Sequence, residues 1–403
     1  MFKISRSISL IVFALLIHNV YSQSVTVKNQ SNVLLKDFMV EIPVNKLPLT
    51  IGNYYVVSKE GVQLPVEIVS DINAEQIAVF SIERLQPNAI LKFNFQRGQA
   101  ENYPKRTYAE IAHKIGGQFV NGKYQGEFSW VKPNFIRLPG NFKDHSYFIK
   151  YEGAGWESDK VAYRFYLDQR NALDAFGKKT PGIVLPAVGV DGYDNYHKMA
   201  VWGMDDMEVG KSLGIGSIAY WDGKKAFRVE KRDSLVCCVI SDGKVRSQIK
   251  TVYYGWEAAN KVNLTSLITI DAGHRASHMV LKIDGKLDNI ATGIIKLKNT
   301  EIIVPPANDG EWTYYATFGC QSMNNDNMGL AIFYRKRQLQ TLTEDELNHV
   351  IVLTPDHGYV EYYFMATWEK EWQPIQDKAS FINAIDDELN CLNQKVSIRV
   401  HKK

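Results

Sequence analysis

Short stretches in which hydrophobic and polar residues alternate run through most of the chain. Between Ser24 and Gln99, segments such as SVTVKN, FMVEIPV, LPVEIVS and ILKFNFQ are rich in β-branched and aromatic residues. Asn, Pro, Gly and Asp separate these segments at intervals of roughly 8–15 residues, which is the pattern of a small β-sandwich. We expect an accessory β-sandwich domain at residues 23–100, followed by a linker at residues 101–110.

Strand patterns continue after the linker. WTYYATFG, GLAIFY and YVEYYFMATW are typical strand sequences, and Asp–Gly pairs at 222–223, 242–243 and 284–285 predict hairpin turns. Only the segment from Ser380 to Leu392 repeats hydrophobic residues at helical spacing, after a serine cap. We therefore predict an all-β fold with few helices. Residues 111–403 would form a large antiparallel sandwich, whose concave sheet is a common place for a sugar-binding groove.

The first 22 residues have a different pattern. Two basic residues precede an apolar run over residues 8–17, and Val20 and Ser22 supply small residues at the third and first positions before a cut at Gln23. This is the pattern of a cleavable secretory signal, too short to span a bilayer comfortably. We expect residues 1–22 to be a signal peptide, and the mature protein to be periplasmic with no membrane span.

Composition and charge narrow the function classes. The chain is 45% hydrophobic and 23% charged, with a formal net charge of +3 and no basic run, which argues against a nucleic-acid partner. An acidic ligand would have to be bound by local arginines and lysines. The four cysteines allow three complete pairings and have no zinc-binding spacing, and buried free thiols explain them equally well. They are Cys237, Cys238, Cys320 and Cys391.

Residues 160–170 separate hydrophobic from charged side chains. In a strand, Val161, Tyr163, Phe165 and Leu167 share one face, which we expect in the core. Arginine binds carboxylates and sulfates through two hydrogen bonds, although a solvent-exposed strand face also commonly carries charges. We predict that the opposite face binds an acidic ligand. It carries Lys160, Ala162, Arg164, Tyr166, Asp168 and Arg170.

A second candidate motif is DGYDNYHKMAVWGMD. It brings Tyr196, His197 and Asp205 within ten residues, near Trp202, after a stretch that suggests a loop. Histidines on loops are often functional, so we predict a direct role for His197. Asp205 would either orient the histidine ring or serve the structure alone.

The segment DAGHRASH is a third candidate. If it is extended, the adjacent His274 and Arg275 point to opposite faces, so at most one of them faces a groove. Metal binding would be another way to neutralise an acidic ligand, and four aspartates could offer oxygen ligands for calcium. They are Asp159, Asp194, Asp205 and Asp206. Their spacing matches no calcium-binding pattern, so we assign no metal or cofactor and leave a divalent cation as the alternative.

Several long motifs resemble a known family. YEGAGWESDKVAYRFYLDQRNALDAFGKK and YHKMAVWGMDDMEVGKSLGIGSIAYW, with YYGW, DAGHR, TGI and MGLAIFY, resemble a Bacteroidota family described as a domain of unknown function, over roughly residues 105–400. The family occurs in polysaccharide-utilisation gene clusters and includes a dehydratase of ulvan oligosaccharides. The resemblance implies a galactose-mutarotase-like supersandwich. It also implies removal of water from a non-reducing-end glucuronate or iduronate, leaving a 4,5-unsaturated uronyl residue.

Such a reaction determines which side chains are needed. It requires a base for the C5 proton, an acid for the 4-hydroxyl, and positive charge on the carboxylate. We predict Arg164 as the carboxylate ligand, and His197 and Tyr166 as base and acid in either order. The predicted substrate-binding residues are Lys160, Asp168, Arg170, Tyr196, Trp202, Asp205, His274 and Arg275.

Other function classes stay open at this point. A polysaccharide lyase would use the same groove but expel a sugar from C4. A non-catalytic protein that passes oligosaccharides to a transporter would use the same arginines and aromatics. A mutarotase or epimerase rests on fold analogy alone, and a glycoside hydrolase is less attractive because no paired carboxylates are evident. In each case the partner is an acidic oligosaccharide, and the sequence does not specify its type of uronate or its sulfation. The sequence also does not specify the oligomeric state of the protein.

Overall fold

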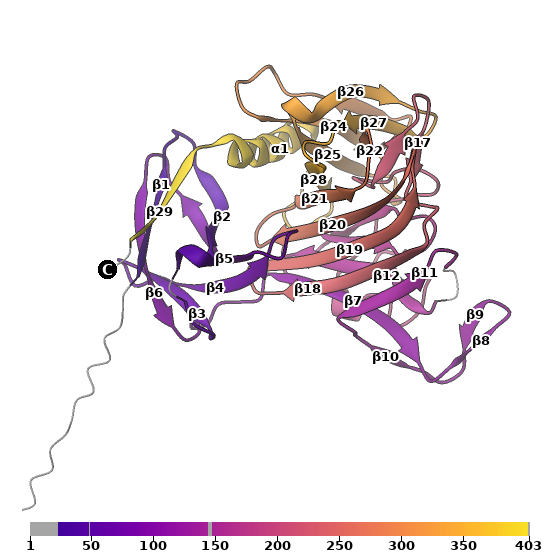
Figure 1. Ribbon diagram of the computed structural model, residues 1–403, viewed down its shortest axis with the longest axis horizontal. Helices are drawn as coiled ribbons and strands as arrows, with labels where there is room; N and C mark the ends of the chain where they lie inside the picture. The colour runs from indigo at the N-terminus through magenta and orange to yellow at the C-terminus, as the bar shows by residue number, and fades with distance from the viewer. Residues whose placement is uncertain (1–22, 48, 144–146, 402–403) are drawn as a thin grey trace, which may run out of the picture.

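The structure is a computed structural model that describes residues 23–47, 49–143 and 147–401. The expected signal peptide, residues 1–22, lies outside the described residues. Strands make up 53% of the described residues and helices 7%, which confirms the all-β fold with few helices. Figure 1 shows a smaller N-terminal part beside a larger body of long strands.

The N-terminal part is one seven-stranded sheet that curls around its own core. In spatial order its strands are β2 (Leu35–Pro43), β5 (Gln76–Leu85), β4 (Gln63–Ser70), β3 (Tyr54–Ser58), β6 (Ile90–Arg97), β1 (Ser24–Asn29) and β29 (Val396–His401). Val40 on β2 and Val27 on β1 belong to the same hydrophobic cluster. Because strands from both ends of the order share a core, the sheet folds over on itself as a sandwich does.

The last strand of the chain belongs to this N-terminal sheet. β29 pairs with β1 along its whole length, from Ser24 opposite His401 to Asn29 opposite Val396. We expected residues 111–403 to lie entirely in the second domain, so this pairing is a correction. Local alternation identifies a strand but not its partner, which here lies at the opposite end of the chain. The expected linker is also shorter, because strand β7 already begins at Thr107.

Three further sheets form the larger body. The nine-stranded sheet contains β11 (Phe135–Pro139), β18 (Ser234–Asp242), β19 (Arg246–Glu257), β20 (Lys261–Asp271), β21 (Ser277–Asp284), β28 (Tyr359–Trp368), β25 (Asn327–Arg335), β24 (Trp312–Cys320) and β23 (Thr300–Ile303). The six-stranded sheet contains β10 (Ser129–Val131), β7 (Thr107–Ile115), β12 (Ile149–Ser158), β13 (Ala162–Tyr166), β14 (Leu173–Lys178) and β15 (Gly203–Asp205). The five-stranded sheet contains β17 (Ala226–Arg228), β16 (Ala219–Trp221), β22 (Ile290–Ile295), β27 (Asn348–Leu353) and β26 (Leu339–Glu344). A separate hairpin consists of β8 (Gln118–Val120) and β9 (Lys123–Gln125).

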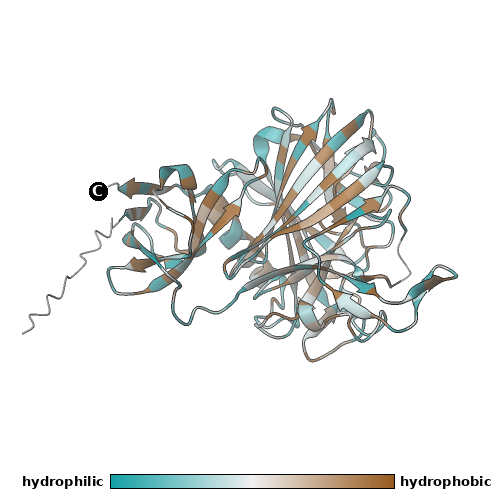
Figure 2. Cartoon of the chain, turned by 60° about the horizontal axis from the view of Figure 1, so that its bottom comes forward, coloured by the Kyte–Doolittle hydropathy of each residue, from teal (hydrophilic) through white to brown (hydrophobic). Residues whose placement is uncertain are grey.

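One hydrophobic core joins these three sheets. Trp156 on β12, Trp256 on β19 and Ile294 on β22 lie in the same buried cluster. The alternating hydrophobic and hydrophilic bands along the strands in Figure 2 correspond to this one-sided packing. Strand β13 and its neighbours β12 and β14 differ from this pattern, because every residue of the three strands is buried. Polar side chains on a strand with both faces covered cannot reach solvent, so they have to be paired within the protein.

Two local predictions are corrected. The turn at Asp284–Gly285 does not close a hairpin, because it connects β21 of the nine-stranded sheet to β22 of the five-stranded sheet. The predicted helix is present as α1 (Lys378–Asn393), but its cap is Asp377, whose side chain accepts from the Ser380 backbone in a capping box. The Asp–Gly pairs at 222–223 and 242–243 do lie between paired strands.

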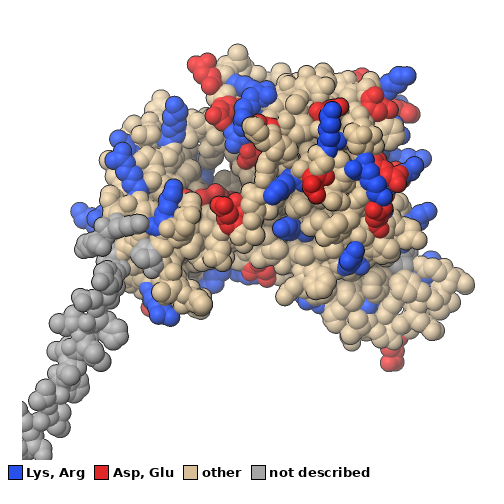
Figure 3. Space-filling view, viewed as in Figure 1, with Lys and Arg blue, Asp and Glu red and all other residues tan. Residues whose placement is uncertain are grey.

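The surface and the thiols add little chemistry. All four cysteines are free. In the described part of the chain, no helix has the length and apolar character that crossing a membrane requires. Figure 3 shows acidic and basic side chains mixed over one face, and a hollow between the N-terminal sheet and the larger body.

Candidate functional site

The β13–β14 hairpin places an arginine opposite an aspartate. Arg164 and Asp174 are direct cross-strand partners. The Arg164 Nε and Nη2 atoms donate to Asp174 Oδ2 at 2.9 and 2.6 Å. On the other face of β13 and of the residues that flank it, Val161, Tyr163, Phe165 and Leu167 all belong to the main core, as predicted from their alternation. The charged face of β13 is therefore covered by a second layer of the protein and is not exposed to solvent.

Strand β15 brings a second carboxyl to the same guanidinium. β15 pairs with β14, where Asp205 lies opposite Phe176. Arg164 Nη2 donates to Asp205 Oδ2 at 2.6 Å and lies 2.5 Å from Tyr166 Oη. With its remaining contacts included, every nitrogen of Arg164 has a protein partner, and the residue is 2% exposed. Two carboxyls around one guanidinium form the centre of a polar cluster.

A β-bulge adds a third carboxylate. The pairing of β12 with β7 shifts register between Ile149 and Ala154, and within this bulge Tyr151 and Glu152 have φ values of 36° and 64°. Glu152 lies 3.8 Å from Arg164 Nη1 and accepts from Arg170 Nη2 at 2.8 Å. Left-handed backbone at such residues costs about 1–3 kcal/mol each and is concentrated at functional sites, as bulges are.

His197 forms the more exposed edge of the cluster. Its Nδ1 lies 3.1 Å from the Tyr193 carbonyl oxygen, and its Nε2 lies 3.2 Å from Asp205 Oδ2. The His197 side chain is 24% exposed, whereas that of Asp205 is fully buried. The three residues predicted to be catalytic, Arg164, Tyr166 and His197, therefore all lie around Asp205.

Burial determines the protonation of the Asp205–His197 pair. Burial raises the pKa of Asp205 well above its ordinary value against the opposing effect of Arg164, and Asp174 adds to the increase. Burial and the charge of Arg164 both lower the pKa of His197. A carbonyl oxygen only accepts, so Nδ1 carries a hydrogen, and in the neutral ring Nε2 presents a lone pair to Asp205. These directions favour a neutral His197 ring beside a protonated Asp205.

Tyr166 is a hydrogen-bond donor in this cluster. Its hydroxyl donates to Asp174 Oδ2 at 2.8 Å and accepts from Arg164. Burial raises the pKa of Tyr166 well above its ordinary value, and the effect of Arg164 only partly opposes this. A tyrosine in this state keeps its proton at neutral pH and is suited to give a proton rather than to take one.

Four predicted substrate-binding residues surround this centre. Asp168 is buried and binds the Arg170 guanidinium, which lies 4.0 Å from the centroid of the Tyr166 ring. Tyr196 accepts from Arg164 Nη1 at 3.2 Å. Trp202 packs edge-to-face on Phe176, with 6.2 Å between ring centroids. Asp205, the fifth such residue, is itself at the centre of the cluster.

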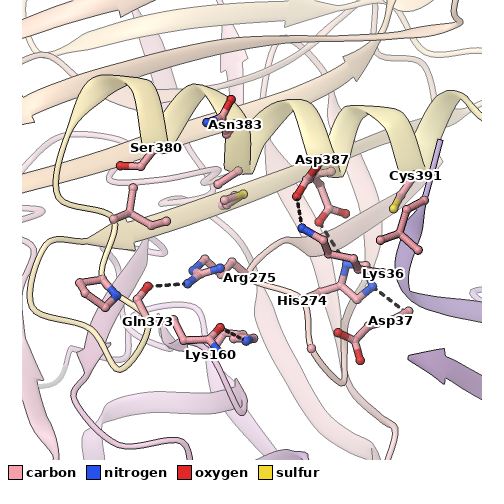
Figure 4. A pocket seen from close by; sticks show the side chains of 17 residues that line it. Lys36, Asp37, Lys160, His274, Arg275, Gln373, Ser380, Asn383, Asp387 and Cys391 are labelled. Carbon is pink, nitrogen blue, oxygen red and sulfur yellow. Dashed lines mark hydrogen bonds and ion pairs between the residues drawn. The ribbon is translucent and has the colours of Figure 1, made fainter. Parts of the chain in front are cut away.

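Lys160, His274 and Arg275 line a different cavity. This cavity of about 480 Å³ lies between β2, α1 and the turn that joins β20 to β21, and none of the cluster residues lines it (Figure 4). His274 and Arg275 both face it, because they lie in a turn and not in an extended strand as we assumed. Their charges are paired within the protein: His274 with Glu388, and Arg275 with Glu371. Lys160 donates to the Gln373 side chain.

A second cavity adjoins the cluster. It has a volume of about 300 Å³. Tyr193 and Tyr196 form the wall that it shares with the cluster. Its other lining residues are Lys114, Phe128, Trp130, Tyr147, Ile149, Lys150, Tyr151, Gly189, Val190, Asp191 and Gly192.

Sequence reasoning missed Asp174, Glu152 and Tyr193. Asp174 had a usable signal, because it and Arg164 are equally distant from Gln169 in the DQRN turn and must face each other in a hairpin. Glu152 and Tyr193 had none, since a bulge and an irregular loop orient them.

The aspartates considered as calcium ligands do not gather. Asp159 binds Arg106, Asp194 is exposed, and Asp205 binds Arg164. Among the residues that the structure describes, no group of three or more His, Cys, Asp or Glu side chains is arranged to hold a metal ion. A divalent cation therefore stays without an identified site.

Comparisons with known proteins place the chain in a family. No curated protein matches it. Two solved structures are similar at 8% identity: a protein in the glycosyl hydrolase family 38 from Enterococcus faecalis (TM-score 0.43), and an alpha-mannosidase from Enterococcus faecalis V583 (TM-score 0.44). Each match covers 95% of this chain but 48% and 46% of the other, so the chain spans about half the length of either protein. The family model described as "Domain of unknown function (DUF4861)" matches residues 27–398, and the chain belongs to that family.

Proposed function

We propose that the protein is an oligosaccharide dehydratase, a carbon–oxygen lyase that removes water from a terminal glucuronate or iduronate of ulvan-type oligosaccharides. The observation that carries this proposal is the meeting of His197, Tyr166 and Arg164 around the Asp174–Asp205 carboxyl pair. Elimination next to a carboxylate needs a base, an acid and stabilisation of developing negative charge, and these groups supply them. The motifs that resemble the dehydratase family are the ones that build this cluster. Export to the periplasm is part of the same proposal.

The pKa directions support an order for the acid and the base. His197 has a lowered pKa, so its ring is neutral near pH 7, and its Nε2 lone pair can accept the C5 proton once the contact with Asp205 is released. Tyr166 has a raised pKa, so it is protonated and able to assist departure of the 4-hydroxyl. In the reaction the C5–H and C4–O bonds break, the C4–C5 double bond forms, and the 4-hydroxyl leaves as water. The proton taken from C5 then passes to solvent through His197, and Tyr166 regains from solvent the proton that completed the water, so the net change is the loss of one water.

Arg164 receives a different role from the one that the sequence suggested. Its nitrogens already donate to Asp174, Asp205, Tyr166 and Tyr196, so it has no free edge for a substrate carboxylate. We assign it as a positioning residue that holds Tyr166 and Asp205.

Arg228 fits the role of carboxylate ligand better. Among the described residues, its guanidinium donates only to the Ser212 carbonyl and has no carboxylate within ion-pair distance. Burial lowers the pKa of Arg228, and the charge of nearby Arg170 lowers it further, against Glu230 and Asp168. A largely buried cation without an acidic partner is costly. The carboxylate of a bound uronate would supply that partner and lie beside Arg170 and Tyr166.

The test is incubation of purified protein with saturated uronyl oligosaccharides. We expect ultraviolet absorbance from a conjugated uronate and, by mass spectrometry, loss of one water without chain shortening. Two fragments would instead indicate a polysaccharide lyase. Binding without any product would indicate a carbohydrate-binding protein and contradict the proposal. Arg228→Met should raise KM about tenfold or more, and an unchanged KM would remove Arg228 from the role.

A further inference from the structure

We propose that the aromatic cavity beside the cluster binds the pyranose ring next to the reacting uronate. Its position relative to that uronate rests on the proposed function, whereas its capacity to bind a sugar ring does not. At about 300 Å³ the cavity is at the lower end of the size range of small-molecule sites. Such sites are lined mainly by apolar and aromatic groups with a few polar atoms, and this cavity has that composition.

Four of the aromatic lining residues form two pairs of closely approaching rings. The ring centroids of Tyr147 and Tyr193 are 4.6 Å apart, and those of Phe128 and Trp130 are 5.7 Å apart at 81°. Such pairs hold each ring in a fixed orientation. Fixed rings offer flat apolar faces to the C–H groups of a pyranose at low entropic cost.

Some polar groups at the cavity are bound within the protein, and others are available to a ligand. The Lys150 ammonium uses its three donors on Glu110, the Leu185 carbonyl and the Pro186 carbonyl, so it belongs to the scaffold. The Asp191 side chain is exposed at the rim and can accept from sugar hydroxyls. The buried Nε1–H of Trp130 has no partner among the described residues.

Backbone strain is concentrated at the same place. Tyr147 and Tyr151, two of the lining residues, have φ values of 59° and 36°. Bulky side chains rarely adopt this left-handed conformation, and strained positions of this kind cluster at ligand sites. The strain places both rings at the cavity.

The cavity shares two of its lining residues with the proposed catalytic cluster. The Tyr193 carbonyl accepts from His197 Nδ1, and the Tyr193 ring lines the cavity. Tyr196, on the same wall, accepts from Arg164. A sugar ring in the cavity would therefore contact Tyr193 and Tyr196, which also contact the proposed catalytic groups.

The experiment measures binding of a neutral probe by calorimetry. The probe is a uronyl oligosaccharide whose carboxyl groups have been reduced to alcohols, so that it cannot use an anion site or undergo the elimination. We expect Trp130→Ala and Tyr147→Ala to weaken its binding by about tenfold or more. Trp130→Phe, which keeps a ring, should retain most of the affinity. Trp372→Ala is the matched control, because Trp372 is 52% exposed and does not line the cavity.

The outcomes separate this inference from the proposed function. Loss of binding in both alanine variants, with none in the control, supports the cavity even if no dehydration is found. Wild-type-like binding by Trp130→Ala and Tyr147→Ala, or no binding of the probe to the wild type, overturns the inference even if dehydration is active. Thermal melting confirms that each variant is folded.

Discussion

At the residue scale, the site is a cluster of mostly buried ionisable side chains around Arg164. Arg164 contacts two carboxyls, and burial raises the pKa of both of them against the opposing effect of Arg164. This arrangement leaves a neutral histidine at the exposed edge. The sequence predicted the residue types and the alternation of β13, and hairpin symmetry would have added Asp174. It could not predict Glu152, because the bulge that turns this residue inward does not follow strand alternation.

The first prediction concerns His197. Removal of a general base typically costs 10²–10⁴-fold in rate, so His197→Ala should lose about that much turnover while remaining folded. A base must be neutral to act, and the pKa of His197 lies below its ordinary value of 6.5. Wild-type turnover should therefore fall only below pH 6.5 on the acid side. The measurement is a pH profile of product formation, and an unchanged rate in a folded His197→Ala protein would refute the assignment.

The second prediction concerns Asp206, which is buried behind the cluster. Burial raises its pKa well above the ordinary value, and Asp205, Asp174 and Glu371 add to the increase. Its Oδ1 has no partner among the described residues. The folded state binds the proton more tightly than the unfolded state, so stability is full below about pH 4 and decreases as pH rises toward the folded pKa.

Asp206→Asn tests this stability effect. The amide has no charge to bury, so the variant should be more stable than wild type at pH 8, by about 1–3 kcal/mol. Its melting temperature should also depend less on pH between 5 and 8. Denaturant unfolding at both pH values measures the difference. Equal pH dependence in the two proteins would show that Asp206 is already ionised at pH 5.

At the element scale, local patterns identified the elements better than their connections. The helix was found from spacing alone, and its cap was misassigned by three residues because Asp377 and Ser380 bind each other reciprocally. The turn at Asp284–Gly285 has hairpin chemistry but joins two sheets. Local residues determine that a turn forms, whereas packing of the core determines which sheet the next strand enters.

The third prediction tests how α1 is held on the nine-stranded sheet. Phe381 is fully buried, and its ring stacks on Phe318 with 5.5 Å between centroids. Gly329 leaves the space that the ring occupies, since a Cβ there would lie 2.4 Å from it. Phe381→Ala should therefore lower the free energy of unfolding by about 3–5 kcal/mol. Ile382→Ala, at a half-buried position on the same helix, should cost clearly less, and equal losses in the two variants would contradict this packing.

At the scale of the whole molecule, ion pairs join the N-terminal sheet to the larger body. Arg106 binds Asp37 on β2 at 2.8 Å and Asp159 after β12 at 2.9 Å. Arg246 on β19 similarly binds Glu41 on β2 at 2.6 Å. The sequence indicated two β regions but not these contacts, because each joins charges that lie far apart along the chain. The pairs keep the N-terminal sheet in a fixed position against the body.

The last prediction tests this junction through Arg106. Its side chain is 20% exposed and those of its partners 15% and 19%, so Arg106→Met leaves two largely buried carboxylates without their cation. Removing one partner of a buried pair costs up to about 3–5 kcal/mol. Because the lost contacts lie between two hydrophobic cores, calorimetric unfolding should divide into two transitions, with the N-terminal sheet melting first. Lys36→Ala is the control, since its pair with Asp387 is 57% and 55% exposed and should matter little. A single transition at the wild-type temperature in Arg106→Met would show that apolar contacts alone hold the two parts together.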